Sequence, residues 1–141
     1  YRAYQKEISL SEGVEEFLDY CKAHNIFIAI LTNGRPKSQY AKVIALDLHR
    51  WFDDDHIFIS GGIGYQKPDP MAFQYIEKMF SLNPEETWYI GDTYEADVVG
   101  ADDAGWHTVW FNHRNRERLK NCADVTVTSI EELSRFIRER S

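Results

Sequence analysis

The sequence predicts an α/β protein in which a parallel sheet lies between two layers of helices, a three-layer, Rossmann-like arrangement. The main observation is that short apolar runs alternate along the chain with amphipathic segments of helical period. The apolar runs are continuous, as in strands that are buried on both faces. Strands that alternate with helices form right-handed crossovers between parallel strands, so the pattern favours one parallel sheet with helices on both faces.

The first half of the chain opens this alternation. Residues 11–24 carry apolar side chains at the i, i+3, i+4 and i+7 positions of a helix, and Ser11 is a suitable N-cap. The apolar run 26–31 predicts a buried strand, and 36–48 predict a second helix. A second strand is expected at 56–60, and a glycine-rich loop is expected after it.

The second half continues the same pattern. Its expected elements are helices over 70–80, 94–104 and 129–139, strands at 87–91, 107–111 and 124–128, and a short polar helix or turn at 114–120. Small residues dominate the helix over 94–104, which allows it to lie close to the sheet, and Gly105 is a natural stop for it.

Composition limits the class of protein. A chain of 141 residues with 43% hydrophobic content has the size of one globular domain. Its net charge of −7 argues against binding to bulk nucleic acid or to an anionic membrane. No apolar run approaches the roughly 20 residues of a membrane-spanning helix. The two cysteines form no CxxC motif, which favours free thiols in a reducing cytoplasm.

Polar side chains follow four of the predicted strands. They are Thr32-Asn33-Gly34, Lys67 in the glycine-rich loop, Gly91-Asp92-Thr93, and Asn112-His113-Arg114. Taken singly, each is an ordinary turn sequence, because Gly, Asn and Asp dominate turns. Taken together they are more informative, because the carboxyl ends of parallel strands meet at one edge of a sheet, where ligands bind.

A hydroxyl, a lysine and a carboxylate at one edge can hold a phosphoryl group. Thr32 can bond its oxygens, Lys67 can offset its charge, and Asp92 can hold a metal. Asp97 lies on the first turn of the next helix and has two interpretations. It is either an acid that the helix dipole stabilises there, or a carboxylate that points to the metal's waters or to Lys67.

Three sequences in this order resemble motifs II, III and IV of the haloacid dehalogenase-like hydrolase superfamily. They are Ile30-Leu31-Thr32-Asn33-Gly34, Gln66-Lys67-Pro68-Asp69-Pro70, and Gly91-Asp92 with Asp97 and Ala104-Gly105. The Gly91-Asp92 pair is similar to the Mg²⁺-dependent phosphatase branch. The sequence Trp110-Phe111-Asn112-His113 is similar to nucleotidase-like members with a helical cap.

The resemblance implies a phosphomonoester phosphatase that acts through an aspartyl-phosphate on a small phosphorylated metabolite, such as a nucleotide or a sugar phosphate. It implies that Thr32 and Lys67 are catalytic, that Thr32 bonds the transferring phosphoryl oxygen, and that Lys67 steadies the nucleophile and the phosphate charge. It further implies that Asp92 binds Mg²⁺ with Asp97 in support. The other residues expected at the phosphate or substrate are Asn33, Gly34, Asn112 and His113.

The chain departs from the family at motif I, an apolar strand that ends in Asp-x-Asp-x-Thr. Its nearest acidic cluster, Asp53-Asp54-Asp55, precedes a strand and reads as a solvated loop. The resemblance implies that motif I supplies the nucleophile, the general acid/base and the central strand of the sheet. We therefore expect an N-terminal segment of the same protein to provide it, residues 1–10 to return from a helical cap, and 11–141 to form the core domain. This chain alone is expected to be inactive.

Two other functions fit the same residues. The first is a non-catalytic phosphate- or metal-binding or scaffold protein, which would bind without turnover. The second and weaker one is a metal-free haloacid dehalogenase, against which Gly91-Asp92 argues.

Overall fold

The computed structural model describes residues 13–118 and 120–140. These residues form two compact units, 13–63 and 64–140, and each is described by itself. The predicted N-cap Ser11 and the expected return segment 1–10 lie outside the described residues. None of the helices in the described ranges has the length and apolar character that crossing a membrane requires.

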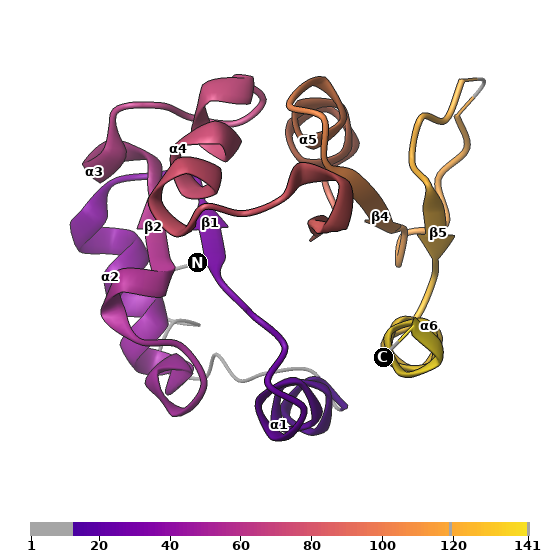
Figure 1. Cartoon of the computed structure of the whole chain (residues 1–141), viewed down its shortest axis with the longest axis horizontal. Coiled ribbons are helices and arrows are strands. Elements are labelled where there is room, and N and C mark those ends of the chain that lie inside the picture. The colour runs from indigo at the N-terminus through magenta and orange to yellow at the C-terminus, as the bar shows by residue number, and fades with distance from the viewer. Residues whose placement is uncertain (1–12, 119, 141) are drawn as a thin grey trace. The chain divides into compact units, whose positions relative to one another are not determined.

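The first unit contains a two-stranded parallel sheet and its connecting helices (Figure 1). Its elements are α1 (Val14–Ala23), β1 (Ile30–Thr32), α2 (Pro36–Ala45), the 3-10 turns η2 (Leu48–Arg50) and η3 (Asp54–His56), β2 (Ile57–Ile59) and α3 (Ser60–Ile63). The buried residues Leu31 and Phe58 are register partners on the neighbouring strands β1 and β2. The helical period predicted near the start of the chain is confirmed, since α1 buries Phe17, Leu18 and Cys21.

Most elements of the first unit are shorter than predicted. The helix predicted over 36–48 is α2, which ends at Ala45 and is followed by the 3-10 turn η2. The strand expected over 26–31 is observed only over Ile30–Thr32, as β1. It is short because only these residues pair with the three-residue strand β2. The loop predicted after residue 60 begins instead with the short helix α3. Gly61 of this helix lies against the turn after β1: its N–H donates to the Gly34 carbonyl at 3.0 Å. A Cβ on Gly61 would lie 2.8 Å from that oxygen, so this close contact requires glycine.

The second unit is built on a three-stranded parallel sheet in the order β3-β4-β5, in which β4 and β5 lie side by side (Figure 1). Its elements are α4 (Pro70–Phe80), the 3-10 turn η4 (Pro84–Glu86), β3 (Trp88–Gly91), the π-helix η5 (Tyr94–Val99), α5 (Gly100–Asp103), β4 (His107–Phe111), β5 (Val125–Val127) and α6 (Ile130–Arg140). Phe73, Val98 and Val109 are fully buried at its centre.

Short-range sequence features explain where several helices of the second unit begin or end. The helix predicted over 70–80 is α4, where Asp69 accepts a hydrogen bond from the Met71 N–H at 2.9 Å as its N-cap. The helix predicted over 94–104 is instead a π-helix followed by the short α5. The predicted stop is confirmed: Gly105 has φ +87°, the left-handed conformation that glycine favours. The polar stretch 113–118 contains a turn and no helix.

The α/β class predicted from the sequence is confirmed, because every strand pair is parallel. Helical segments lie between consecutive strands except between β4 and β5, where the described residues contain none. Within the described residues, β1 pairs only with β2, and β3 pairs only with β4. The central strand that the family resemblance implies remains a prediction about a segment beyond these residues.

Candidate active site

The carboxyl ends of β3 and β4 bring two of the predicted polar sequences together in the second unit. Gly91 ends β3 opposite Trp110 of β4, so Asp92 and Asn112-His113 follow neighbouring strands. The Asp92 Oδ2 atom lies 3.1 Å from the His113 Nε2 atom. This edge of the sheet therefore gathers a carboxylate and an imidazole from positions 21 residues apart.

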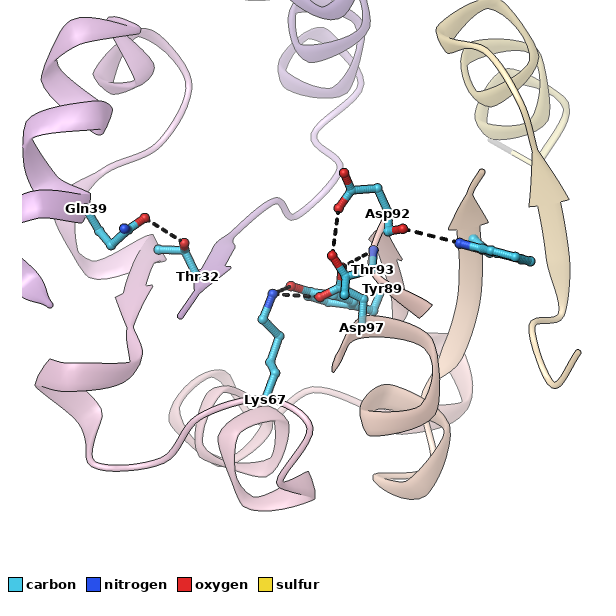
Figure 2. A network of polar contacts seen from close by, with 8 residues as sticks. Thr32, Gln39, Lys67, Tyr89, Asp92, Thr93 and Asp97 are labelled. Carbon is cyan, nitrogen blue, oxygen red and sulfur yellow. Dashed lines mark hydrogen bonds and ion pairs between the residues drawn. The ribbon is translucent and has the colours of Figure 1, made fainter. Parts of the chain in front are cut away.

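A buried ion pair lies next to this edge. The Lys67 Nζ atom donates to the Asp97 Oδ1 atom at 2.6 Å and to the Tyr89 hydroxyl at 3.1 Å, as Figure 2 shows. The Lys67 and Asp97 side chains are only 11% and 6% exposed. Burial by itself lowers the pKa of Lys67, but its interactions with Tyr89 and Asp97 outweigh this effect and hold the pKa above its usual value. Lys67 is therefore a stable positive charge.

Two glycines explain why this pair can form. Gly91 leaves room for Asp97, because a Cβ at position 91 would lie 2.3 Å from the Asp97 side chain. Gly100 leaves room for the segment that carries Lys67, because a Cβ there would lie 2.8 Å from Phe73 and 3.0 Å from the Pro68 Cα atom. Small residues at these points allow η5 and α5 to pack directly against β3 and the Lys67 segment.

Asp97 is held from both sides. Its Oδ1 atom accepts from Lys67, and its Oδ2 atom accepts from the Thr93 backbone N–H at 3.0 Å. Of the roles that the sequence leaves open for Asp97, this structure shows the contact with Lys67.

Asp92 lies closer to solvent, with 42% of its side chain exposed. Its Oδ2 atom contacts His113 and lies 3.8 Å from the Arg114 guanidinium, while its Oδ1 atom accepts from the Thr93 hydroxyl at 3.3 Å. Partial burial raises the pKa of Asp92, but the hydrogen bond to His113 and the charge of Arg114 outweigh this, and the pKa lies below its usual value. Asp92 is thus an accessible, ionised carboxylate.

The described residues fit a Mg²⁺ ion only in part. Mg²⁺ prefers oxygen ligands, and Asp92 offers an accessible carboxylate. The carboxylate of Asp97 is already engaged at both oxygens by Lys67 and Thr93. Across 13–118 and 120–140, no three His, Cys, Asp or Glu side chains gather as a metal site. Asp92 can therefore be one ligand of a site whose remaining ligands come from elsewhere.

The motif after β1 belongs to the first unit and has its own contacts. The Thr32 hydroxyl donates to the Gln39 Oε1 atom at 3.0 Å (Figure 2). The Gly34 N–H donates to the Ser60 hydroxyl at 2.8 Å, and Asn33 is exposed. These contacts shape the turn that presents Thr32 and Asn33 at the end of the strand.

Asn112 has a local role in the turn after β4. Its Nδ2 atom donates to the Arg116 carbonyl at 2.8 Å, and its Oδ1 atom accepts from the Arg116 N–H at 2.9 Å. The buried side chain therefore closes the segment 112–116 into a turn that carries His113 and Arg114. A substrate contact for Asn112 and His113 stays a prediction.

Sequence reasoning missed one contact residue in each unit, Ser60 in the first and Tyr89 in the second. Tyr89 stands in an apolar strand, where an aromatic residue is expected as core, yet its hydroxyl contacts Lys67. One signal was present: Tyr89 and Gly91 are two residues apart on β3, so the Tyr89 side chain points to the face that Gly91 leaves open. No feature of the sequence around Ser60 indicates its contact with Gly34, because that contact depends on how β1 and β2 pair.

Comparison with known proteins identifies similar sequences. A protein family described as haloacid dehalogenase-like hydrolase matches residues 1–105. The chain is 33% identical over 125 residues to glyceraldehyde 3-phosphate phosphatase of Pyrococcus furiosus, which covers 86% of this chain and 51% of that protein. It is 34% identical over 130 residues to phosphoserine phosphatase of Thermus thermophilus, covering 92% of this chain and 51% of that protein. The chain thus spans about half the length of these curated relatives.

A solved structure supports the same fold. The HAD-hydrolase YfnB of Bacillus subtilis, in a form bound to magnesium, matches with a TM-score of 0.79 and 29% identity. The match covers 91% of this chain and 56% of that one.

Proposed function

Because this chain belongs to the haloacid dehalogenase-like hydrolases, we propose that the full-length protein is a phosphatase that acts on a small phosphorylated metabolite, such as a nucleotide or a sugar phosphate. The names of two similar proteins, glyceraldehyde 3-phosphate phosphatase and phosphoserine phosphatase, support this class of substrate, because each names a small phosphorylated molecule. The observation that carries the proposal is the buried Lys67–Asp97 pair beside the carboxyl end of β3. Asp97 holds the Lys67 ammonium in place at the edge where parallel sheets bind ligands.

Each predicted site residue has a distinct role in this proposal. Lys67 offsets the negative charge of the phosphoryl group and of the attacking carboxylate. The Thr32 hydroxyl has one proton, so it must leave Gln39 to donate to a phosphoryl oxygen. Asn33 lies beside Thr32 in sequence and would bond a further oxygen, while His113 would face the leaving group. The Gly34 N–H donates to the Ser60 hydroxyl, so it too must leave its partner to reach a phosphoryl oxygen.

The nucleophile is proposed to be an aspartate of a segment outside this chain. Its carboxylate attacks phosphorus, the bond from phosphorus to the leaving oxygen breaks, and that oxygen takes a proton from the general acid that motif I is expected to supply. Water then hydrolyses the aspartyl-phosphate, which restores the carboxylate and releases phosphate. Since motif I, which would carry this aspartate, is absent from the sequence, this chain alone is expected to be inactive.

Mg²⁺ is the proposed cofactor, with Asp92 as the ligand that this chain supplies and Asp97 in support of the metal's shell. When bound, Mg²⁺ neutralises charge that develops on the phosphoryl oxygens. The magnesium-bound form of YfnB supports this choice. The exposed, ionised state of Asp92 also suits it.

A phosphatase assay of the full-length gene product tests the proposal. Wild-type protein is expected to release phosphate from p-nitrophenyl phosphate with Mg²⁺ and to stop when EDTA is added. Lys67→Met and Asp92→Asn should strongly reduce release. Lys78→Met, which removes an exposed lysine of α4, is the matched control and should retain it.

Other outcomes would favour the alternatives. Binding of phosphate or Mg²⁺ with no turnover would indicate a binding or scaffold protein. Halide release from a haloacid without Mg²⁺, and no release of phosphate, would indicate a dehalogenase.

A further inference from the structure

We propose that Tyr89 is a positioning residue, whose hydroxyl fixes the direction of the Lys67 ammonium for catalysis. The inference rests on the proposed role of Lys67 in binding the phosphoryl group. Lys67 Nζ lies 3.1 Å from the Tyr89 hydroxyl and 2.6 Å from the Asp97 Oδ1 atom. These two contacts come from different elements, β3 and η5.

The second contact matters because lysine has a long, flexible stem. An ion pair with Asp97 alone sets the distance of the ammonium from one oxygen but leaves its direction variable. A second acceptor restricts that direction, since the N–H donors of an ammonium point along separate axes. Tyr89 supplies this second acceptor.

The Tyr89 hydroxyl is itself held in place by its ring. The ring packs edge-on against Phe73 of α4, with centroids 5.0 Å apart, and lies 6.4 Å from the Trp106 ring. Phe73 is fully buried and Trp106 is nearly so. Because the Tyr89 ring is partly buried and packs against these two rings, its side chain has little freedom to change rotamer, and the hydroxyl is a fixed acceptor for the long lysine side chain.

A tyrosine also suits the charge of the site. Burial is the main cause that raises the pKa of Tyr89 to about 12, so the side chain stays neutral below that pH. Its oxygen accepts a hydrogen bond from Lys67 without adding a second negative charge beside Asp97. An acidic residue in the same place would cancel more of the positive charge that a phosphoryl group needs, and phenylalanine would fill the space without any acceptor.

The first test is spectroscopic and uses the full-length protein with ¹⁵N-labelled lysine. The Lys67 ammonium resonance is assigned by its loss in Lys67→Met. In Tyr89→Phe, which keeps the ring, we expect that resonance to shift and broaden through faster exchange with water. Tyr40→Phe is the matched control, because it removes a hydroxyl that donates to Asp54 in the first unit and should leave the resonance unchanged.

The second test is kinetic. Loss of one hydrogen bond that acts in the transition state lowers kcat by about tenfold in Tyr89→Phe, with KM changed by less than about twofold. In the Lys67→Met background the Tyr89→Phe change should have no further effect, because Tyr89 acts through Lys67. Urea unfolding of each variant serves as the control that the variant still folds.

The outcomes separate this inference from the proposed function. An unchanged Lys67 resonance in Tyr89→Phe, or a kcat equal to wild type, would overturn the positioning role. A kcat loss of equal size with and without Lys67 would also overturn it, since the effect would then be structural. An inactive wild-type protein whose Lys67 resonance still depends on Tyr89 would support the contact and overturn the phosphatase activity instead.

Discussion

Replacing Lys67 by methionine is expected to destabilise the second unit through the carboxylate that it leaves behind. Methionine keeps most of the unbranched stem but removes the ammonium. Asp97, whose side chain is 6% exposed, then loses the partner of its Oδ1 atom and keeps only the Thr93 N–H on its Oδ2 atom. A buried charge without its counter-charge is costly.

The expected loss in the free energy of unfolding follows from the geometry of the ion pair. Removing one partner of a buried ion pair costs about 3–5 kcal/mol. The retained bond from Thr93 places this case near the lower end, at about 3 kcal/mol. With a urea m-value of about 2 kcal/mol per molar, the unfolding midpoint should fall by about 1.5 M.

The assay is urea unfolding of the full-length protein, followed by circular dichroism. The double variant Lys67→Met/Asp97→Asn removes the orphaned charge and should recover at least half of the loss. Lys78→Met is the control and should unfold close to wild type, since that side chain is exposed. A loss below about 1 kcal/mol in Lys67→Met, or no recovery in the double variant, would refute the reasoning that the pair is buried and coupled.

Three further predictions concern the same edge of the sheet. Gly91→Ala should destabilise the protein by about 1–3 kcal/mol in urea unfolding, because the new Cβ would lie 2.3 Å from Asp97; a neutral effect would contradict the close packing. The pKa of Asp92 lies below its usual 3.8, so its contribution to stability is present above that pH and is lost as the pH falls through the lower folded value. A ¹³C titration of the carboxyl group should show this pKa rise in His113→Ala, and an unchanged value would discount the His113 contact. Asp92→Asn should weaken Mg²⁺ binding to the full-length protein by calorimetry, and wild-type affinity in that variant would exclude Asp92 as a ligand.

Local elements could be predicted well from the sequence because their signals are local. Pro70 after an N-capping Asp69 defines the start of α4, and the apolar run 107–111 defines β4. The order of polar residues at the strand ends could be read for the same reason, since each follows its own apolar run. Asp92 and His113 meet because parallel strands place their carboxyl ends at one edge.

Side-chain partners could not be predicted, because they depend on packing between distant segments. Asp97 had several possible partners in the sequence, and the absence of a Cβ at Gly91 lets η5 bring it to Lys67. The Tyr89 hydroxyl reaches Lys67 only because Phe73 and Trp106 hold its ring. The sequence by itself therefore determined the α/β class and the chemical groups at each strand end, which follow from short-range periodicity. Only the tertiary structure decided which of those groups touch, because contacts between residues 22 and 30 positions apart are set by how the helices pack on the sheet.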